Sequence, residues 1–590
     1  MSLTTVWYWF VRTCWIEARD VMTHHTTVKL VICWHMHQPD YRDHIRDEFQ
    51  QPWVYLHAIR DYTDMAAHLE NNPEAKAVVN FSPILLEQLA VYEKQIAGFL
   101  NNSEAIRDPL LAALDAAVFP SEPDSRIALV RACLRSNRKT QIEPYAAYAK
   151  LAGIADSILS DSHSSTYLSN QYIADLVTWY HLAWLGETVR RSHSGVRELM
   201  EQGTGFSLHQ RRTLLQLVGE CITSIRDRYR KLAANGQIEL STSPYTHPML
   251  PLLLSFDSAR EAQTDVRLPI LDRYPGGTER VRWQLQHGLS VFEDYFGFRP
   301  AGCWPSEGGI CDASLQMIGE AGFKWVATGE SVLTNSINRY PANDNDTRDI
   351  YGPYSHATSD LRIFARDDTL SDLIGFTYAD WHADDAVANL VHAIESIVND
   401  RPDRKDLVIS IIMDGENAWE YYPENGYYFI STLYQSLAEH PYIQLTTYQE
   451  TIADQKTRPI SNIVPGSWVF GNFSTWIGDE DKNRAWDILG DAKRVYDDVC
   501  AQQELDASKR AMIDRQLAAC EGSDWFWWFG DYNPARSVSD FEHLYRTHLA
   551  NLYQMLTKEP PQYLAETFAH GHGSPVLGGV IRPGKSGESG

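Results

Sequence analysis

Positive charge is scarce in this sequence of 590 residues. Lys and Arg together number 52 against 77 Asp and Glu, and the formal net charge is −25. Proteins bind nucleic acids and anionic membranes through clustered Lys and Arg, so we expect neither as a partner. The sequence also lacks the stretch of about 20 nearly uninterrupted apolar residues that a membrane-spanning helix needs. A neutral substrate suits this charge balance.

Closely spaced cysteines are missing as well. The eight cysteines are dispersed, and no two of them have the two-residue spacing of a zinc knuckle or a redox motif. Reduced thiols in a cytoplasm are the simplest interpretation, so we expect a cytoplasmic protein. Residues 1–21 are apolar and aromatic, but charged residues interrupt them and no small-residue cleavage site follows. We therefore expect an N-terminal extension there, not a signal peptide.

Aromatic residues, in contrast, are plentiful. They make up 12% of the chain and include 18 tryptophans, which is more than core packing usually requires. Aromatic rings stack on the apolar faces of sugars, and they also fill large cores. Both uses are open for each individual ring.

Short apolar runs alternate with helical patterns over much of the chain. Runs of strand length occupy residues 28–34, 238–240, 301–304, 324–328, 374–378 and 407–413. Strands that alternate with helices predict a parallel sheet or barrel. Residues 85–235, in contrast, have helical spacing and few strand signals, which predicts a helical insertion.

We expect four regions along the chain. Residues 1–27 form the N-terminal extension, and residues 28–455 form one large catalytic domain that includes the insertion. Residues 456–570 form a mainly helical region that completes the active-site cleft. Residues 571–590 are rich in Gly, Ser and Pro and predict a disordered tail.

Two histidines follow the first apolar run. If the strand persists through His35 and His37, both imidazoles point to the same side. The carboxyl ends of parallel strands meet on one face, so such residues reach a shared site. Structural hydrogen bonding, metal binding and substrate binding are all open for this pair. A metal site needs a third ligand at a recognisable spacing, and none is visible, so we expect no metal and no cofactor.

Two acidic residues follow other apolar segments. Glu307 lies in GCWPSEGG and Asp414 in IIMDGENAWE, where glycine, proline and tryptophan surround them. Glycoside hydrolysis needs one carboxylic acid to protonate the leaving oxygen and one carboxylate to attack or to guide water. A solvated loop glutamate and a turn that Asp414 caps with Gly415 are the alternatives. Glu416 competes with Asp414 for the acid role, because a continuing strand places both on one face.

The ordered motifs resemble glycoside hydrolase family 57, the retaining α-glucan enzymes. HMHQP at 35–39, IELSTSPYTHPMLPLL at 238–253, GCWPSEGGI at 302–310, MDGENAWE at 413–420 and the stretch 467–486 carry the resemblance. Residues 53–65, 370–376 and 523–531 are supporting matches, and coverage runs roughly from residue 28 to 556. The resemblance implies a (β/α)7 barrel, an α/β fold, with a helical insertion and a C-terminal helical region.

The resemblance also implies roles for individual residues. Glu307 would carry the covalent intermediate and Asp414 would act as acid/base, so that Asp414 outranks Glu416. We expect the substrate-binding residues to be His35, His37, His247, Trp304, Glu416, Trp419, Trp468 and Trp476.

The motif forms around His247 and Asp414 look more like those of α-amylases and amylopullulanases than those of branching enzymes. We expect a retaining hydrolase of α-1,4-glucans (starch, glycogen and maltooligosaccharides), with α-1,6 branches as a further target. A 4-α-glucanotransferase with the same pair is the alternative. A metal-dependent sugar deacetylase and a non-catalytic glucan-binding protein rank lower. Two segments, Gly308-Gly309 and Thr328-Gly329-Glu330, depart from the usual family forms. They lie in the shell of the expected pocket, so the departures bear on subsite preference and not on the chemistry.

Overall fold

The structure is a computed structural model that describes residues 27–573, apart from 160–163, 165–166, 344–347, 358, 403 and 455. The expected N-terminal extension and C-terminal tail therefore lie almost wholly outside the described residues. Among the described helices, none is long and apolar enough to cross a membrane. The cysteines in the described part of the chain are all free thiols.

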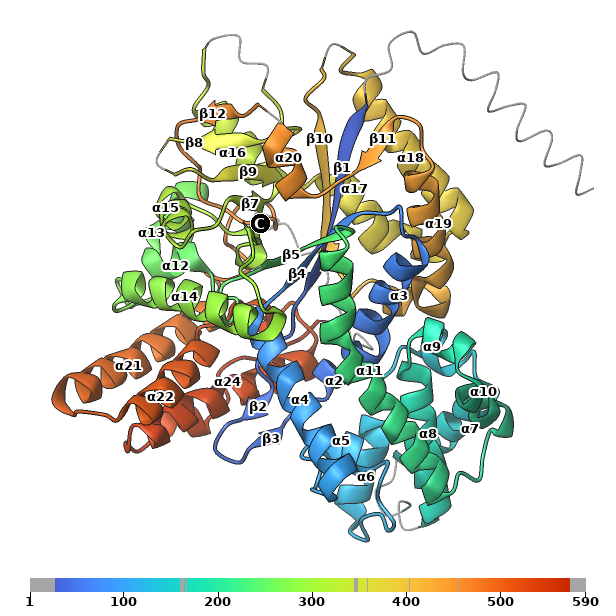
Figure 1. Cartoon of the computed structure of the whole chain (residues 1–590). Helices are drawn as coiled ribbons and strands as arrows, with labels where there is room; N and C mark the ends of the chain where they lie inside the picture. The colour runs from blue at the N-terminus through green and yellow to red at the C-terminus, as the bar shows by residue number, and fades with distance from the viewer. Residues whose placement is uncertain are drawn as a thin grey trace, which may run out of the picture.

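A curled sheet of parallel strands forms the centre of the fold (Figure 1). In spatial order its strands are β10 (Val408–Asp414), β1 (Val28–Met36), β4 (Ala77–Phe81), β5 (Ile238–Thr242), β6 (Gly302–Cys303), β7 (Trp325–Thr328) and β9 (Arg362–Ala365). The two ends of this order meet where the N–H of Asp367, just after β9, donates to the carbonyl of Ser410 on β10 at 2.8 Å. The expected (β/α)7 barrel is thereby confirmed.

Side-chain alternation along the strands divides the interior of the barrel from its helix-covered outside. Leu30, Ile32 and Trp34 of β1 belong to the large outer core, whereas Val31 and Cys33 belong to a second cluster inside the barrel. Successive side chains of a strand point to opposite faces. The inner face of β1 therefore continues to His35 at the carboxyl end of the strand.

Helices cover the outside of the barrel, as a parallel sheet requires. They are α2 (Trp53–His57), α3 (Thr63–Asn71), α12 (Leu250–Leu254), α13 (Asp257–Ala262), α14 (Gly277–Phe296), α15 (Asp312–Glu320), α16 (Glu330–Arg339), α17 (Asp368–Asp372), α18 (Ala383–Asn399), α19 (Tyr427–Ala438) and α20 (Tyr448–Asp454). Three short strands extend the sheet beyond the barrel: β8 (Tyr354–His356), β11 (Ile443–Leu445) and β12 (Arg458–Ile460).

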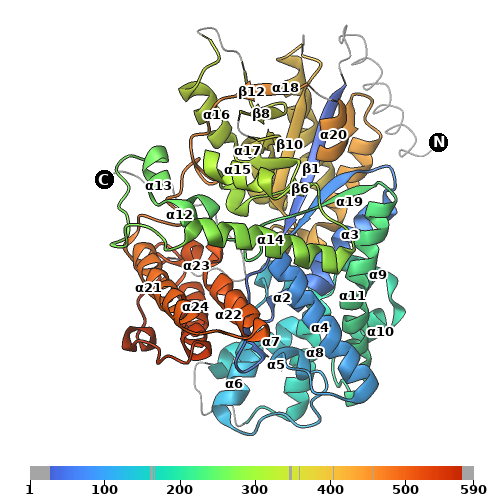
Figure 2. The same cartoon turned by 60° about the vertical axis from the view of Figure 1, so that its left-hand side comes forward.

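The segment between β4 and β5 is helical. It contains α4 (Pro83–Asn102), α5 (Pro109–Ala112), α6 (Pro123–Ala132), the π-helix η3 (Arg138–Ile142), α7 (Ala146–Leu159), α8 (Asn170–Trp184), α9 (Glu187–Ser192), α10 (Ser194–Gln202) and α11 (Leu208–Ala234). The C-terminal segment contains α21 (Glu480–Gln502), α22 (Ala507–Cys520), α23 (Ser523–Trp528) and α24 (Ala535–Met555). Figures 1 and 2 show helices of both segments beside the same end of the barrel.

One predicted strand is wrong. Residues 374–378 contain aromatic residues and a threonine, which are typical of strands, but the structure has the π-helix η6 (Leu373–Thr377) at this position. The cause lies upstream, where the Asp367 carboxylate accepts a hydrogen bond from the Leu370 N–H at 2.8 Å and starts helix α17. η6 continues this helix. The barrel strand of this region is β9, four residues long and earlier in the chain.

Candidate active site

The carboxyl ends of the barrel strands gather the polar side chains of the expected site. His35 on β1 pairs in register with Asp414 on β10 and with Asn80 on β4. Asn80 donates its amide N–H to Ser241 Oγ at 3.0 Å. In this orientation its oxygen, 2.8 Å from His35 Nδ1, accepts, so His35 Nδ1 carries the proton. His35 Nε2 is then a buried acceptor without a protein partner.

Three histidines stack against one another beside this strand end. The ring centroids of His37 and His247 are 4.1 Å apart, and those of His35 and His247 are 4.9 Å apart. Burial lowers the pKa of His35 to about 3, with a contribution from neighbouring His37. Burial and the two neighbouring histidines also lower the pKa of His247 well below its usual value. His35 and His247 are therefore neutral near pH 7 and offer polar atoms without positive charge.

Glu307 lies in a short turn after β6. Its backbone has φ of 58°, a left-handed conformation that is rare for a residue with a side chain and that often marks functional sites. The next residue, Gly308, also has positive φ, and a Cβ there would lie 2.9 Å from the Trp304 ring. The turn therefore needs glycine at that position. It aims the Glu307 carboxyl group at the stacked histidines, 3.7 Å from His247 Nδ1.

Two donors hold the Glu307 carboxyl group. Trp468 Nε1–H donates to one oxygen at 3.1 Å, and Ser523 Oγ–H donates to the other at 3.0 Å. Burial raises the pKa of Glu307 to about 8, and the negative charges of Asp524 and Asp414 contribute. The two hydrogen bonds act in the opposite direction, because they stabilise the ionised form.

Asp414 ends β10 and borders a cavity of about 560 Å³. Asn417 donates its amide N–H to Asp414 at 2.9 Å. Burial raises the pKa of Asp414 above its usual value. Trp468 contacts both parts of the site, since it lines the cavity while its indole N–H binds Glu307. Asp414 therefore borders the cavity directly, whereas Glu307 does not line it and is connected to it through Trp468.

The remaining predicted residues occupy different positions. Trp304 is buried and packs edge-on against Trp468, with ring centroids 5.6 Å apart. Glu416 is buried behind the site, where it accepts from Gln38 Nε2 at 2.7 Å and from the His37 backbone N–H at 3.3 Å. It therefore supports the loop that carries the histidines.

Trp419 and Trp476 belong to the core. Both rings are fully buried, and neither lines the cavity. Trp419 donates its indole N–H to the carbonyl of Gly415 at 2.9 Å. The structure therefore does not bring these two expected substrate-binding residues to the surface of the site.

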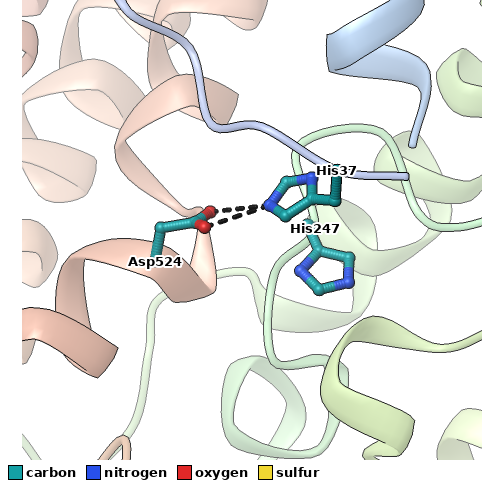
Figure 3. A group of neighbouring side chains, drawn as sticks. All are labelled: His37, His247 and Asp524. Atoms are coloured by element: carbon teal, nitrogen blue, oxygen red, sulfur yellow. Dashed lines mark hydrogen bonds and ion pairs between the residues drawn. The ribbon is translucent and has the colours of Figure 1, made fainter. Parts of the chain in front are cut away.

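Helix α23 contributes residues to which the sequence assigned no role. Ser523 binds Glu307, and both carboxylate oxygens of Asp524 lie 3.0 Å from His37 Nε2 (Figure 3). The other nitrogen of His37 lies 2.7 Å from Ser82 Oγ at the end of β4. Residues 523–531 were a supporting match to the family, but no local pattern indicated that they contact residues almost 500 positions earlier.

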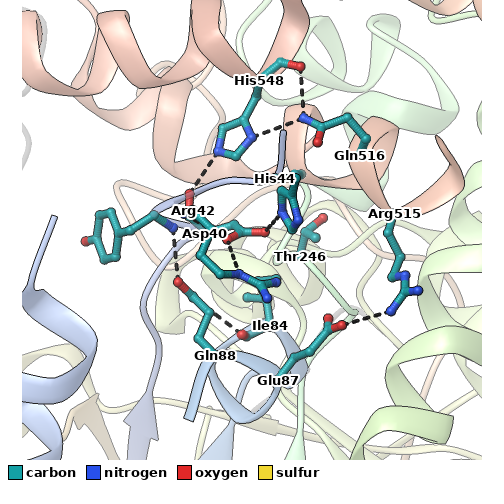
Figure 4. Close-up of polar contacts among 12 residues, drawn as sticks. Asp40, Arg42, His44, Ile84, Glu87, Gln88, Thr246, Arg515, Gln516 and His548 are labelled. Atoms are coloured by element: carbon teal, nitrogen blue, oxygen red, sulfur yellow. Dashed lines mark hydrogen bonds and ion pairs between the residues drawn. The ribbon is translucent and has the colours of Figure 1, made fainter. Parts of the chain in front are cut away.

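A second polar cluster anchors the loop after His37 (Figure 4). His548 on α24 binds the backbone carbonyl of Asp40 through Nε2 at 2.9 Å. The Asp40 carboxylate pairs with Arg42 at 3.2 Å and with His44 at 2.6 Å. Burial alone would raise the pKa of Asp40, but His44 and Arg42 hold it well below its usual range. The C-terminal helices thus fix the loop that positions His37.

His37, His247 and Asp524 are the described residues that approach a metal-binding arrangement, with potential ligand atoms within 4.8 Å of one another (Figure 3). Asp524 is a third potential ligand that sequence spacing did not reveal. The His37 and His247 rings, however, are stacked at an angle of only 30°. Imidazole lone pairs lie in the ring plane, so two stacked rings direct them side by side and do not converge on one ion.

EDTA treatment is therefore expected to leave the catalytic step intact. The measurement is initial rate on maltooligosaccharides before and after chelation, with metal content determined on the same sample. Stoichiometric zinc in the purified protein, with activity lost on chelation and restored by zinc, would contradict the expectation and favour a deacetylase-like reaction.

Comparison with known proteins gives a family and a set of related folds. A sequence model of the family described as glycosyl hydrolase family 57 matches residues 31–464. The chain has no match among curated proteins.

Three solved structures share the fold, each at 15% sequence identity. A GH57 branching enzyme from the hyperthermophilic archaeon Thermococcus kodakaraensis has a TM-score of 0.55 over 90% of this chain and 90% of that chain. A GH57-type branching enzyme from Pyrococcus horikoshii has 0.54 over 94% and 99%. The alpha-amylase AmyC from Thermotoga maritima has 0.54 over 90% and 94%.

Proposed function

The chain belongs to glycosyl hydrolase family 57, and on this basis we propose that it is a retaining enzyme acting on α-1,4-glucans such as starch, glycogen and maltooligosaccharides. The paired carboxyl groups of Glu307 and Asp414 carry the proposal. They follow two barrel strands, Glu307 is buried and Asp414 is half-buried, and burial together with the negative charges of Asp524 and Asp414 raises the pKa of Glu307. An α-glucan chain is the proposed substrate, and α-1,6 branches are a further target.

The first step forms a covalent glucosyl-enzyme. A carboxylate oxygen of Glu307 attacks the anomeric carbon while Asp414 transfers its proton to the leaving oxygen, and the glycosidic bond breaks. The raised pKa of Asp414 suits a group that must be protonated before attack. Trp468 and Ser523 hold both oxygens of Glu307 and favour its ionised form.

The second step releases the sugar. Water approaches on the side that the leaving group has vacated, gives its proton to the Asp414 carboxylate and forms a bond to the anomeric carbon as the ester to Glu307 breaks. The neutral histidines contact the sugar through unpartnered acceptors such as His35 Nε2. Because they carry no positive charge, they do not form a competing ion pair with Glu307.

The Asp524→Asn variant is expected to shift the acid limb of the pH profile of kcat/KM to lower pH. Glu307 attacks only when ionised, so activity falls as pH decreases through its pKa. Burial raises that pKa and the negative charge of Asp524 adds to it, so removing the charge lowers the pKa. Asparagine keeps an oxygen that can accept from His37.

The pH profile of kcat/KM for wild type and variant checks this expectation. Asp531→Asn is the matched control, because Asp531 is exposed shortly after α23. An unmoved limb, or a limb moved to higher pH, would show that Asp524 does not raise the pKa of the nucleophile.

A 4-α-glucanotransferase is the second candidate, favoured by the cavity beside Asp414, which gives room for a sugar acceptor. The two activities differ only in whether water or a sugar hydroxyl resolves the intermediate. We expect net hydrolysis on long glucans, with reducing ends rising steadily on soluble starch and transfer at high oligosaccharide concentration. If maltotriose instead gives longer and shorter products without such a rise, the enzyme is a transferase.

A further inference from the structure

The cavity beside Asp414 lies on one side of the carboxyl pair. Asp414 and Trp468 line it, whereas Glu307 and the three stacked histidines do not. In the proposed reaction Asp414 protonates the oxygen of the departing chain, while Glu307 holds the sugar that stays. The cavity is therefore on the side of the leaving chain, which is also the side from which an acceptor arrives.

Two exposed phenylalanine rings line this cavity. Phe376 is 52% exposed and Phe470 is 42% exposed, although both are large apolar side chains. They come from different elements: Phe376 from the π-helix η6, and Phe470 from the loop that begins at Trp468. Single exposed apolar residues are common, but two rings at one cavity next to a catalytic carboxyl group form an apolar surface of the kind that sugars stack on.

The backbone at Phe470 supports a functional reason for its position. Phe470 has φ of 55°, a conformation that bulky residues rarely adopt. The loop is held on both sides of it, because the Trp468 N–H donates to the Glu307 carbonyl at 3.0 Å and Ser467 Oγ donates to the Asn472 carbonyl at 2.6 Å. Strained backbone conformations cluster at functional sites, where the direction of a side chain matters. Glycine would fit this backbone more easily.

From these observations we propose that Phe376 and Phe470 are the sugar platforms for the acceptor, and that they control how the glucosyl-enzyme divides between water and a second glucan. The proposal rests on the function proposed above. In the transfer step the acceptor hydroxyl oxygen bonds to the anomeric carbon, the ester bond to Glu307 breaks, and the hydroxyl proton moves to the Asp414 carboxylate. An acceptor held on apolar rings both excludes water and places that hydroxyl.

The test separates donor chemistry from acceptor binding. The donor is α-maltosyl fluoride, whose leaving group is a fluoride ion that uses neither ring, and the acceptor is maltotriose. Phe376→Ala and Phe470→Ala should release fluoride at the wild-type rate without acceptor. At acceptor concentrations below saturation, transfer to maltotriose should fall about tenfold in each variant, the loss of one stacking contact.

Further variants distinguish a platform from a structural role. Phe470→Gly relieves the left-handed backbone, so it should lose transfer while its Tm stays at or above the wild-type value. Phe470→Tyr keeps a ring and should keep transfer. Phe298→Ala is the matched control, because Phe298 is 39% exposed but follows α14 and does not line the cavity.

Every outcome of these measurements either supports the proposal or overturns it. Transfer that is unchanged in both alanine variants, or fluoride release that falls as much as transfer does, overturns it. The same holds if Phe298→Ala has an equal effect. A wild-type protein that releases no fluoride and cleaves no glucan would refute the proposed function itself, whereas an active wild type with unaffected variants would refute only the assignment of the platforms.

Discussion

Glu307→Gln is expected to lower kcat on maltooligosaccharides by a factor on the order of 10⁴ or more, because the amide cannot form the covalent intermediate. The fold should persist. Gln keeps one oxygen for the Trp468 N–H, and its amide can donate to Ser523 Oγ, which both accepts and donates. Loss of a buried charge also removes a desolvation cost. Near wild-type activity in purified protein would show that Glu307 is not the nucleophile.

Glu420→Gln is the matched control for this variant. Burial raises the pKa of Glu420 to about 8, the same value as for Glu307, and the residue is likewise buried. Glu420 does not line the cavity. A large loss in Glu307→Gln together with near wild-type turnover in Glu420→Gln would separate the catalytic role from the general effect of removing a buried carboxyl group.

A second variant at the same position tests the stereochemistry. Glu307→Ala opens space where a small anion such as azide can replace the carboxylate. Azide would attack the anomeric carbon on the face opposite to the leaving chain, as Glu307 does, and would give a β-glycosyl azide from an α-glucan. An α-linked azide product would be incompatible with a retaining mechanism that uses Glu307.

The barrel was predictable because most of its strands lie in short apolar runs bounded by helical patterns. The predicted strands near residues 28, 238, 302, 325 and 408 are confirmed as β1, β5, β6, β7 and β10. β4 and β9 were missed, since Asn80 interrupts the apolar run of β4 and β9 begins with Arg362. In the barrel, pairing with neighbouring strands stabilises such short strands, and the local periodicity of the sequence does not show this pairing.

The candidate site was likewise only partly predictable from the sequence. His35 and Asp414 each stand at the end of a strand, so the strand pattern alone predicts that they meet. Ser523 and Asp524 reach the site only because the C-terminal helices fold back over the barrel, and that is a tertiary contact with no local signal.

The high aromatic content of the chain did not predict which aromatic residues lie at the site. Trp419 and Trp476 were expected at the substrate, but both fill the core. Phe376 and Phe470 line the cavity and had no pattern that singled them out. Whether a ring packs inside or faces a cavity depends on the direction of the backbone at that residue, as the positive φ of Phe470 illustrates.

Asp414→Asn is expected to slow the cleavage of starch by a factor of about 10² to 10⁴, the usual contribution of general acid–base catalysis. Asparagine cannot give a proton to the departing sugar oxygen. A glucosyl donor with an acidic leaving group, such as α-maltosyl fluoride, needs little protonation and should keep most of its glycosylation rate. The measurement is the ratio of the two rates in variant and wild type.

Glu416→Gln distinguishes the two acidic residues of the same motif. Glu416 is buried behind the site and is bound by Gln38 and the His37 backbone, so it has no path to the leaving oxygen. Its loss should affect starch and the fluoride donor equally, through the loop that carries His37. If the selective loss on starch appeared in Glu416→Gln instead, the acid would be Glu416, and the proton would have to reach the leaving group after a rearrangement of the loop at residues 414–417.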